Sequence, residues 1–308
     1  MFDGIDEVIL PVAEMKTLQN LYEHLFGFTL ISETELTDPN WQVLWGLPLP
    51  PTRTVLLAKP LSNGGWIRLV EVPGLPAASP AGRPDRPGPF ALDFYLRDAQ
   101  SSESRIETGG WNFRSPASFY NLPGTEIPVR ERMLEQPISG LVHASVQYRP
   151  KGTRCVLDQD ENEVISEVVA VVHFTDRIEE AKRFASEVLG AQLYFEGDFD
   201  DPAVAEILSL NPGEGFCVAL YRGPQSRNAR LEFAELLPGG TRQQDSIPRV
   251  ISRCAIDDLE RLAESLSPGE HGLSTGILFI DTPEGRSQRL GLRSRYGADF
   301  EFFERERS

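Results

Sequence analysis

The chain has 308 residues, of which 40% are hydrophobic and 25% are charged, a composition typical of globular proteins with about two domains. Its formal net charge of −16 argues against binding to nucleic acid or to anionic membranes, because both need clustered Lys and Arg side chains. No apolar run reaches the roughly 18–20 residues of a membrane span, the first residues lack a secretory signal, and the three cysteines are widely spaced, so we expect a cytoplasmic protein without disulfide bonds.

The first predicted unit begins with a strand at 7–12. An amphipathic helix follows, with apolar residues at Met15, Leu18, Leu21, Tyr22 and Leu25, which is the spacing of one buried helix face. Gly27 stands where the end of a helix favours a residue of positive φ. Three further strands are predicted near 28–32, 54–58 and 66–72, so the unit is βαβββ.

The second predicted unit follows a proline-rich linker at 72–89. It begins with a strand at 91–96, continues with a short helix after Asp98 and ends with a strand at 141–148. The polar run 158–163 then separates the two halves of the chain. This unit has the same order of elements as the first, with a poorer helical pattern.

The third predicted unit repeats the first. Val171-Val172-His173 corresponds to Val8-Ile9-Leu10, and Val188-Leu189-Gly190 corresponds to Leu25-Phe26-Gly27. Its remaining strands are predicted near 192–195, 217–221 and 230–236. The fourth unit repeats the second, follows a linker that starts at Pro238 and ends with a strand at 299–304. A repeat of this length indicates supersecondary units that pack against one another.

These units resemble the vicinal oxygen chelate superfamily, which includes glyoxalase I, bleomycin-resistance proteins and type I extradiol dioxygenases. Leu21-Tyr22-Glu23-His24-Leu25-Phe26-Gly27-Phe28 is similar to the superfamily's F-Y-x-x-x-L-G-F helix end, and residues 67–71, 231–235 and 300–304 are similar to its I-E-L-x-E strand. The resemblance covers nearly the whole chain. It implies an α+β fold of four tandem βαβββ modules, paired into two cup-shaped half-barrel sheets with helices outside.

The resemblance also implies two domains, each with one cup made by consecutive modules. The N-terminal domain would span 1–155, with modules at 1–75 and 88–150. The C-terminal domain would span 156–308, with modules at 164–238 and 247–305.

In this superfamily a metal is held at the bottom of the cup by residues of the first and fourth strands of both paired modules. The corresponding residues are Glu7, Arg68, Ala91 and His143 in the first cup and Ala170, Glu232, Ile251 and Glu301 in the second. An extradiol dioxygenase needs two His and one carboxylate, so that activity is not expected. Because an arginine cannot ligate a cation, we expect no metal and no cofactor, with a divalent ion at Glu7 and His143 as the open alternative.

The candidate catalytic residues are Glu7, Arg68 and His143. Arg68 would bind an anionic group, and His143 or Glu7 would transfer a proton; the alternative is a structural Glu7–Arg68 salt bridge. Glu232 and Glu301 would face each other in the second cup, either sharing a proton or held by nearby arginines. The aromatic residues that would line a ring-shaped ligand, or else belong to the core, are Trp41, Trp45, Trp111, Phe113 and Tyr120.

Two functions are compatible with these features. The first is an enzyme acting by proton transfer on a small cyclic or aromatic organic acid or carbonyl compound, as an isomerase, lyase or hydrolase. The second is a non-catalytic protein that sequesters such a compound in a metal-free cup. A cup with both a proton-transfer group and a cation favours the enzyme, and a closed Glu7–Arg68 pair beneath aromatic rings favours the binding protein. We favour the enzyme, expect a small-molecule partner without nucleic acid or membrane, and leave open a homodimer.

Overall fold

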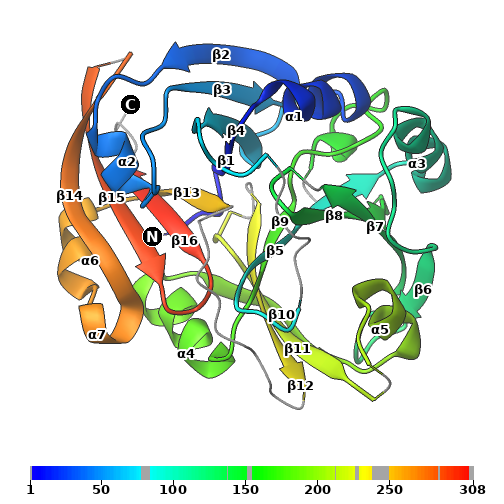
Figure 1. Ribbon diagram of the computed structural model, residues 1–308. Helices are drawn as coiled ribbons and strands as arrows, with labels where there is room; N and C mark the ends of the chain where they lie inside the picture. Colours follow the sequence, from blue (N-terminus) through cyan, green and yellow to red (C-terminus); the bar gives the residue numbers. More distant parts are fainter. Residues whose placement is uncertain are drawn as a thin grey trace.

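The computed structural model describes residues 2–77, 84–136, 138–150, 155–211, 213–225, 229–237, 250–283 and 285–304. These residues form two eight-stranded sheets, with the strand orders β14-β15-β16-β13-β1-β4-β3-β2 and β10-β11-β12-β9-β5-β8-β7-β6 (Figure 1). The linker that starts at Pro238 lies outside the described residues, as do residues 78–83 of the linker at 72–89. In the part of the chain that is described, no helix is long and apolar enough to cross a membrane.

The first two modules contain the elements that were expected, with one extra short helix. Module one consists of β1 (Glu7–Val12), α1 (Lys16–Asn20, continued by a π-helical turn at Leu21–Leu25), β2 (Thr29–Glu35), α2 (Asn40–Leu44), β3 (Arg53–Ala58) and β4 (Trp66–Glu71). Module two consists of β5 (Gly88–Leu96), α3 (Ala99–Thr108), β6 (Ser118–Asn121), β7 (Pro128–Gln136) and β8 (Leu141–Gln147).

The last two modules repeat this order. Module three consists of β9 (Ala170–Phe174), α4 (Ile178–Arg183, continued by a π-helical turn at Phe184–Val188), β10 (Gln192–Phe199), α5 (Pro202–Leu208), β11 (Gly215–Arg222) and β12 (Arg230–Leu237). Module four consists of β13 (Ile251–Ile256), α6 (Leu259–Ser265), α7 (Pro268–His271), β14 (Gly272–Thr282), β15 (Gly285–Ser294) and β16 (Asp299–Glu304). The prediction of four βαβββ modules is confirmed.

The beginnings and ends of the helices follow the local sequence. Asp98, Asp201 and Asp258 precede α3, α5 and α6, and each accepts a hydrogen bond from a main-chain N–H of the first turn. Gly27 and Gly190 have φ angles of 75° and 66°, the left-handed conformation in which glycine terminates a helix. The two repeats therefore stop their first helices in the same way.

The modules pair differently from the expectation. β1 is antiparallel to β13, with Glu7 opposite Arg253, so modules one and four share a sheet. β5 is antiparallel to β9, with Asp93 opposite Ala170, so modules two and three share the other. The expected pairing of consecutive modules is wrong, and residues 1–155 and 156–308 each supply half of both sheets. Every module presents an equivalent first strand, so the repeat alone does not determine which two strands meet.

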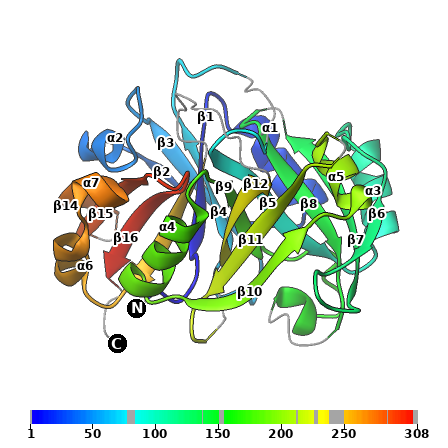
Figure 2. The same ribbon diagram turned by 90° about the horizontal axis from the view of Figure 1, so that it is seen from below.

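Each sheet curls into a cup, named here the β1/β13 cup and the β5/β9 cup after its central strands. The largest apolar cluster joins both sheets to α1, α3, α4 and α6 on the faces away from the cups. α2 covers the β1/β13 cup and packs beside β14 and β15, and α5 covers the β5/β9 cup and packs beside β6. Figure 2 shows these two covering helices at opposite ends of the molecule. Each cup is thus covered by a helix from one of its two modules, and this helix packs against strands of the other module.

Candidate functional site

The floor of the β1/β13 cup is organised around Glu7. Arg68 Nε on β4 donates to Glu7 Oε2 at 2.5 Å, and Arg253 Nη1 on β13 donates to Oε1. Glu7 is only 3% exposed. Burial would raise its pKa, but the charges of Arg253 and Arg68 outweigh burial and lower the pKa to about 2. Glu7 is therefore ionised at neutral pH, and each of its oxygens accepts from an arginine. This arrangement is the structural salt bridge that was expected as the alternative to a catalytic role.

Glu301 on β16 completes this floor. Its Oε1 accepts from Arg253 Nε at 3.0 Å and lies 3.3 Å from Arg289 Nε, while its Oε2 accepts from the Trp45 indole N–H at 2.7 Å. Arg253 also stacks on Phe303, with 4.0 Å between the guanidinium carbon and the ring centroid. With Glu7 and Arg68 included, three guanidinium groups surround two carboxylates, so positive charge is in excess.

Apolar side chains in and after α2 fill much of the space above this floor. Trp41 and Trp45 lie with their ring centroids 4.6 Å apart and pack against β1, β4 and β13. A cavity of about 160 Å³ remains beside Trp45, lined mostly by apolar side chains and by Asp299. Burial raises the pKa of Asp299 to about 7, against the opposing charge of Arg293. The ionic floor of the cup is therefore closed, and the cavity beside Trp45 is an apolar corner of the same cup.

The floor of the β5/β9 cup carries three carboxyl groups, Asp93 on β5, Glu131 on β7 and Glu232 on β12. Burial raises the pKa of Asp93 well above its usual value, and the charges of Glu232 and Glu131 add to this effect. Burial also raises the pKa of Glu232 to about 7, against the charge of Arg230. The pKa of Glu131 is raised by burial too, although its oxygen accepts from the Tyr120 hydroxyl at 2.6 Å. These three carboxyl groups therefore keep their protons to a higher pH than exposed carboxyl groups do.

The side chains next to Asp93 on the cup face are small. Its neighbours across the sheet are Ala144 on β8 and Ala170 on β9, and Ala91 lies two residues earlier on the same face. Asp93 and Glu232 are deeply set in the protein but remain partly accessible to solvent. Polar groups that converge on a recessed, solvent-accessible and mainly apolar surface are typical of a ligand site.

Arg230 on β12 is a cation whose charge acts on both Asp93 and Glu232. Its Nη2 donates to the Tyr95 hydroxyl at 2.8 Å, and its Nε donates to the Val169 carbonyl at 3.0 Å. These two hydrogen bonds fix the guanidinium at one end of the carboxyl pair. The β5/β9 cup therefore combines proton-transfer groups with a positioned cation.

His143 does not lie in either cup. The side chains on both sides of it in β8 pack under α5, whereas His143 faces the main core, is fully buried, and is hydrogen-bonded through Nε2 to the Tyr22 hydroxyl at 2.8 Å. Burial lowers its pKa to about 4, so the ring is neutral at pH 7. Its expected position beside Glu7 and Arg68 is wrong for two reasons. β8 belongs to the other sheet, and an offset of one residue in a strand reverses the face.

The expected aromatic wall is divided among three places. Trp41 and Trp45 lie in the β1/β13 cup, Trp111 and Phe113 pack on the main core away from the cups, and Tyr120 lines the β5/β9 cup. The expectation of one common wall is wrong, because module two pairs with module three and not with module one.

Glu232 and Glu301 also lie in different sheets, so they do not face each other. Each instead has another partner, Asp93 for Glu232 and the pair Arg253 and Arg289 for Glu301. The expectation of a Glu232–Glu301 pair is therefore wrong for the same reason, the exchange of partner modules.

The sequence analysis missed Asp93 and considered Arg253 only among the arginines near Glu301, which it contacts, although the repeat carries a signal that relates the two residues. Asp93 lies two residues after Ala91, on the same face of the same strand. In the repeat that matches Ala91 with Ile251, Asp93 matches Arg253. Testing the next inward-facing position of each first strand would have found both residues.

The positions at which the resemblance implied a metal do not fit a divalent ion. In the β1/β13 cup, Arg68 and Arg253 place permanent cations against both oxygens of Glu7. Across the described ranges, no group of three or more His, Cys, Asp or Glu side chains is arranged to hold a metal ion. We therefore assign no chemical step to a metal.

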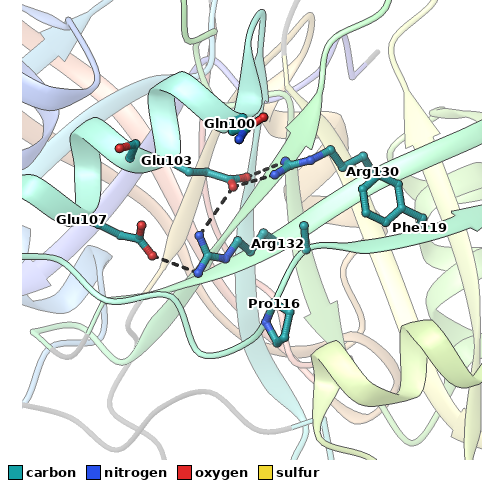
Figure 3. A pocket seen from close by; sticks show the side chains of 9 residues that line it. Gln100, Glu103, Glu107, Pro116, Phe119, Arg130 and Arg132 are labelled. Atoms are coloured by element: carbon teal, nitrogen blue, oxygen red, sulfur yellow. Dashed lines mark hydrogen bonds and ion pairs between the residues drawn. The ribbon is translucent and has the colours of Figure 1, made fainter.

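A pocket of about 500 Å³ lies outside both cups, between α3 and β7 (Figure 3). Its charged side chains already neutralise one another. Arg130 donates to both oxygens of Glu103 at 2.7 and 2.8 Å, and Arg132 pairs with Glu107 at 2.9 Å. This surface groove leaves no unpaired charge for a ligand among the two arginines and two glutamates that it contains.

Comparison with known proteins identifies solved structures with a similar fold. No family model matches the chain, and no curated protein matches its sequence. Maize glyoxalase I has a similar structure, with a TM-score of 0.65 and 13% identity over 98% of this chain and 92% of that one. A putative dioxygenase from Bacillus subtilis is also similar, with a TM-score of 0.61 and 12% identity over 98% of this chain and 85% of that one.

The chain therefore has the vicinal-oxygen-chelate fold over nearly its whole length. Identities this low transfer the architecture without the activity. The function has to be argued from the two cups.

Proposed function

We propose that the protein is an acid–base enzyme whose site is the β5/β9 cup, and that it transfers a proton at a carbon next to a carbonyl group of a small cyclic or aromatic compound. The observation that carries the proposal is the Asp93–Glu232 carboxyl pair, deeply set but reached by solvent. Two carboxyl groups that repel each other do not ionise together, so one stays protonated as an acid while the other is ionised as a base.

The pair can perform a complete proton transfer without a further reactant. The ionised carboxylate removes the proton from the substrate carbon, while the protonated partner gives its proton to the carbonyl oxygen, forming an enol. Reverse transfer from the pair returns a proton to the carbon and takes one from the oxygen. Arg230 stabilises the ionised member of the pair through its positive charge.

Metal-free sequestration of a small molecule is the second candidate function. The closed Glu7–Arg68 pair beneath Trp41 and Trp45 favours it, because the β1/β13 cup has an apolar corner and no free acid–base group on its ionic floor. In that case a ligand binds and leaves unchanged.

Hydrogen–deuterium exchange tests the two candidates. A panel of cyclic and aryl ketones is incubated with the protein in D₂O, and loss of the α-proton signal is followed by NMR. We expect accelerated exchange for part of the panel, reduced about 10²–10⁴-fold in Asp93→Asn and in Glu232→Gln. Glu206→Gln, an exposed carboxylate on α5, is the matched control and should exchange like wild type.

Exchange that persists unchanged in both carboxyl variants overturns the enzyme proposal. Ligand-induced shifts without exchange, in wild type as in the variants, establish the binding protein in its place. Circular dichroism of each variant checks that the fold is kept.

A further inference from the structure

Two arginines meet at one end of the β5/β9 cup. β11 ends at Arg222 and β12 begins at Arg230, and the pair next to them in the antiparallel register is Tyr221 opposite Leu231. Leu220 and Glu232, one step further along, face the cup. Since side chains alternate along a strand, Arg222 and Arg230 are cross-strand neighbours on the cup face.

An aromatic ring contacts both guanidinium groups. The guanidinium carbon of Arg222 is 4.8 Å from the centroid of Tyr194, and that of Arg230 is 5.4 Å from the same centroid. Arg230 also lies 5.7 Å from the Tyr95 ring. The two cations are thus held in place by aromatic faces, which position a guanidinium without neutralising its charge.

Neither arginine has an ion-pair partner within 4.0 Å in the described part of the chain, and Arg222 Nε is buried without a hydrogen-bond acceptor. The arginines of the other cup differ, because Arg68, Arg253 and Arg289 all contact a carboxylate. Like charges on neighbouring strands destabilise a sheet. Asp93 and Glu232 act on Arg230 at longer range, but among the described residues no carboxylate contacts either guanidinium directly, which leaves both open to an anion from outside.

We propose that Arg222 and Arg230 bind the carboxylate of the substrate, which makes the substrate a small keto acid. This inference rests on the proposed function, because it assumes that the reacting carbon lies over Asp93 and Glu232. A carboxylate suits two planar guanidinium groups, each of which can donate two parallel hydrogen bonds. A doubly charged phosphate fits less well, since the carboxyl groups of the same floor repel additional negative charge.

The strand spacing sets the size of the ligand. Asp93 lies opposite Ala170 of β9, and Ala170 lies opposite Arg230 of β12. Two strand spacings of about 4.8 Å place the carboxylate and the reacting carbon roughly 10 Å apart at most. One ring between the two groups spans this distance, and the residue between them, Ala170, has a small side chain.

Benzoate is a suitable probe, because it has the ring and the carboxylate but no exchangeable α-proton. Benzamide, the neutral analogue, controls for binding of the ring alone. We expect NMR titration to show benzoate binding at least tenfold tighter than benzamide, weakening as salt is added. Arg222→Gln should lose this preference at least tenfold, while Arg183→Gln, an exposed arginine on α4, should keep it.

The melting temperature Tm gives a second test. For an arginine with only a structural role, the two changes in Tm described next are not expected. Removing one of two adjacent unpaired charges should raise the Tm of Arg222→Gln without ligand and abolish the increase in Tm that benzoate produces in wild type. Equal benzoate affinity in wild type and Arg222→Gln overturns the anion site.

The outcome is separable from the test of the proposed function. Asp93→Asn and Glu232→Gln should bind benzoate at least as tightly as wild type, since they remove negative charge. Benzoate binding that depends on Arg222, in a protein that exchanges no ketone or keto acid, refutes the enzyme and keeps the anion site. Exchange at the wild-type rate in Arg222→Gln refutes the anion site and keeps the enzyme.

Discussion

The two cups are built from the same kind of module, yet the charged groups of their floors are arranged differently. In the β1/β13 cup three guanidinium groups surround two carboxylates, and every one of these groups has a charged partner. In the β5/β9 cup three carboxyl groups share the floor, their pKa values are raised, and two arginines at its end lack ion-pair partners among the described residues. Paired charges stabilise a fold, whereas charges left unpaired at a cost in stability mark the place where a ligand is expected.

Replacement of Glu7 by Gln should have the largest effect. The change leaves Arg68 and Arg253 buried against a neutral amide, and breaking a buried ion pair in this way costs about 3–5 kcal/mol. Urea denaturation at pH 7 measures the loss of unfolding free energy.

Glu107→Gln is the matched control for Glu7→Gln, since Glu107 pairs with Arg132 at 2.9 Å but is 45% exposed. Exposed pairs contribute about 0–1 kcal/mol, so this variant should stay close to wild type. Similar losses in both variants would show that the β1/β13 floor is no more important than a surface pair.

Replacement of Glu232 by Gln should instead increase the free energy of unfolding. The pKa of Glu232 is raised to about 7 in the fold, so the unfolded chain ionises first and wild-type stability falls as pH rises from about 4.5 to 7. The amide does not ionise, and we expect the variant to gain on the order of 1–2 kcal/mol relative to wild type between pH 4 and pH 8.

Urea denaturation of wild type and Glu232→Gln at pH 4, 6 and 8 measures this gain, with Glu206→Gln as a control that should show none. For Glu7 the relation is reversed: its pKa is lowered to about 2, so its contribution is present above about pH 4.5 and is lost as pH falls towards 2. Parallel pH profiles for Glu7→Gln and Glu232→Gln would contradict the contrast between the cups.

Replacement of Trp45 by Phe should destabilise the protein less than Glu7→Gln does. It keeps the aromatic packing on Trp41 but removes the N–H that donates to Glu301 at 2.7 Å. A hydrogen bond to a charged group contributes about 1.5–3 kcal/mol, less when other donors remain, and two arginines still contact Glu301. A loss of about 1–2 kcal/mol in urea is expected; no loss would mean that the arginines alone hold Glu301.

The repeat predicted the four modules, because helix ends and strand spacings are local properties. Gly27 and Gly190 adopt the expected left-handed conformation, and Asp98 and Asp258 cap the expected helices. The choice of partner modules was not predictable in this way. It depends on which modules pair through their first strands. Because the modules are repeats, these strands have similar sequences and do not indicate their partner.

The candidate site was predicted only in part. Glu7 and Arg68 meet as expected, because strands β1 and β4 belong to one module and their register follows from it. His143 was misplaced by one residue, which in a strand changes a cup residue into a core residue. The pairing of Asp93 with Glu232 depends on two modules meeting, so only the assembled sheets reveal it.

The order in which the strands meet also bears on how the chain is made on the ribosome. Modules two and three are consecutive, so the sheet around β5 and β9 can close while synthesis is still under way. β1 must wait for β13, which emerges more than two hundred residues later, and its backbone edge stays unsatisfied in the meantime. A nascent polypeptide halted before module four would expose that edge, and it is this intermediate that chaperones are expected to protect from aggregation.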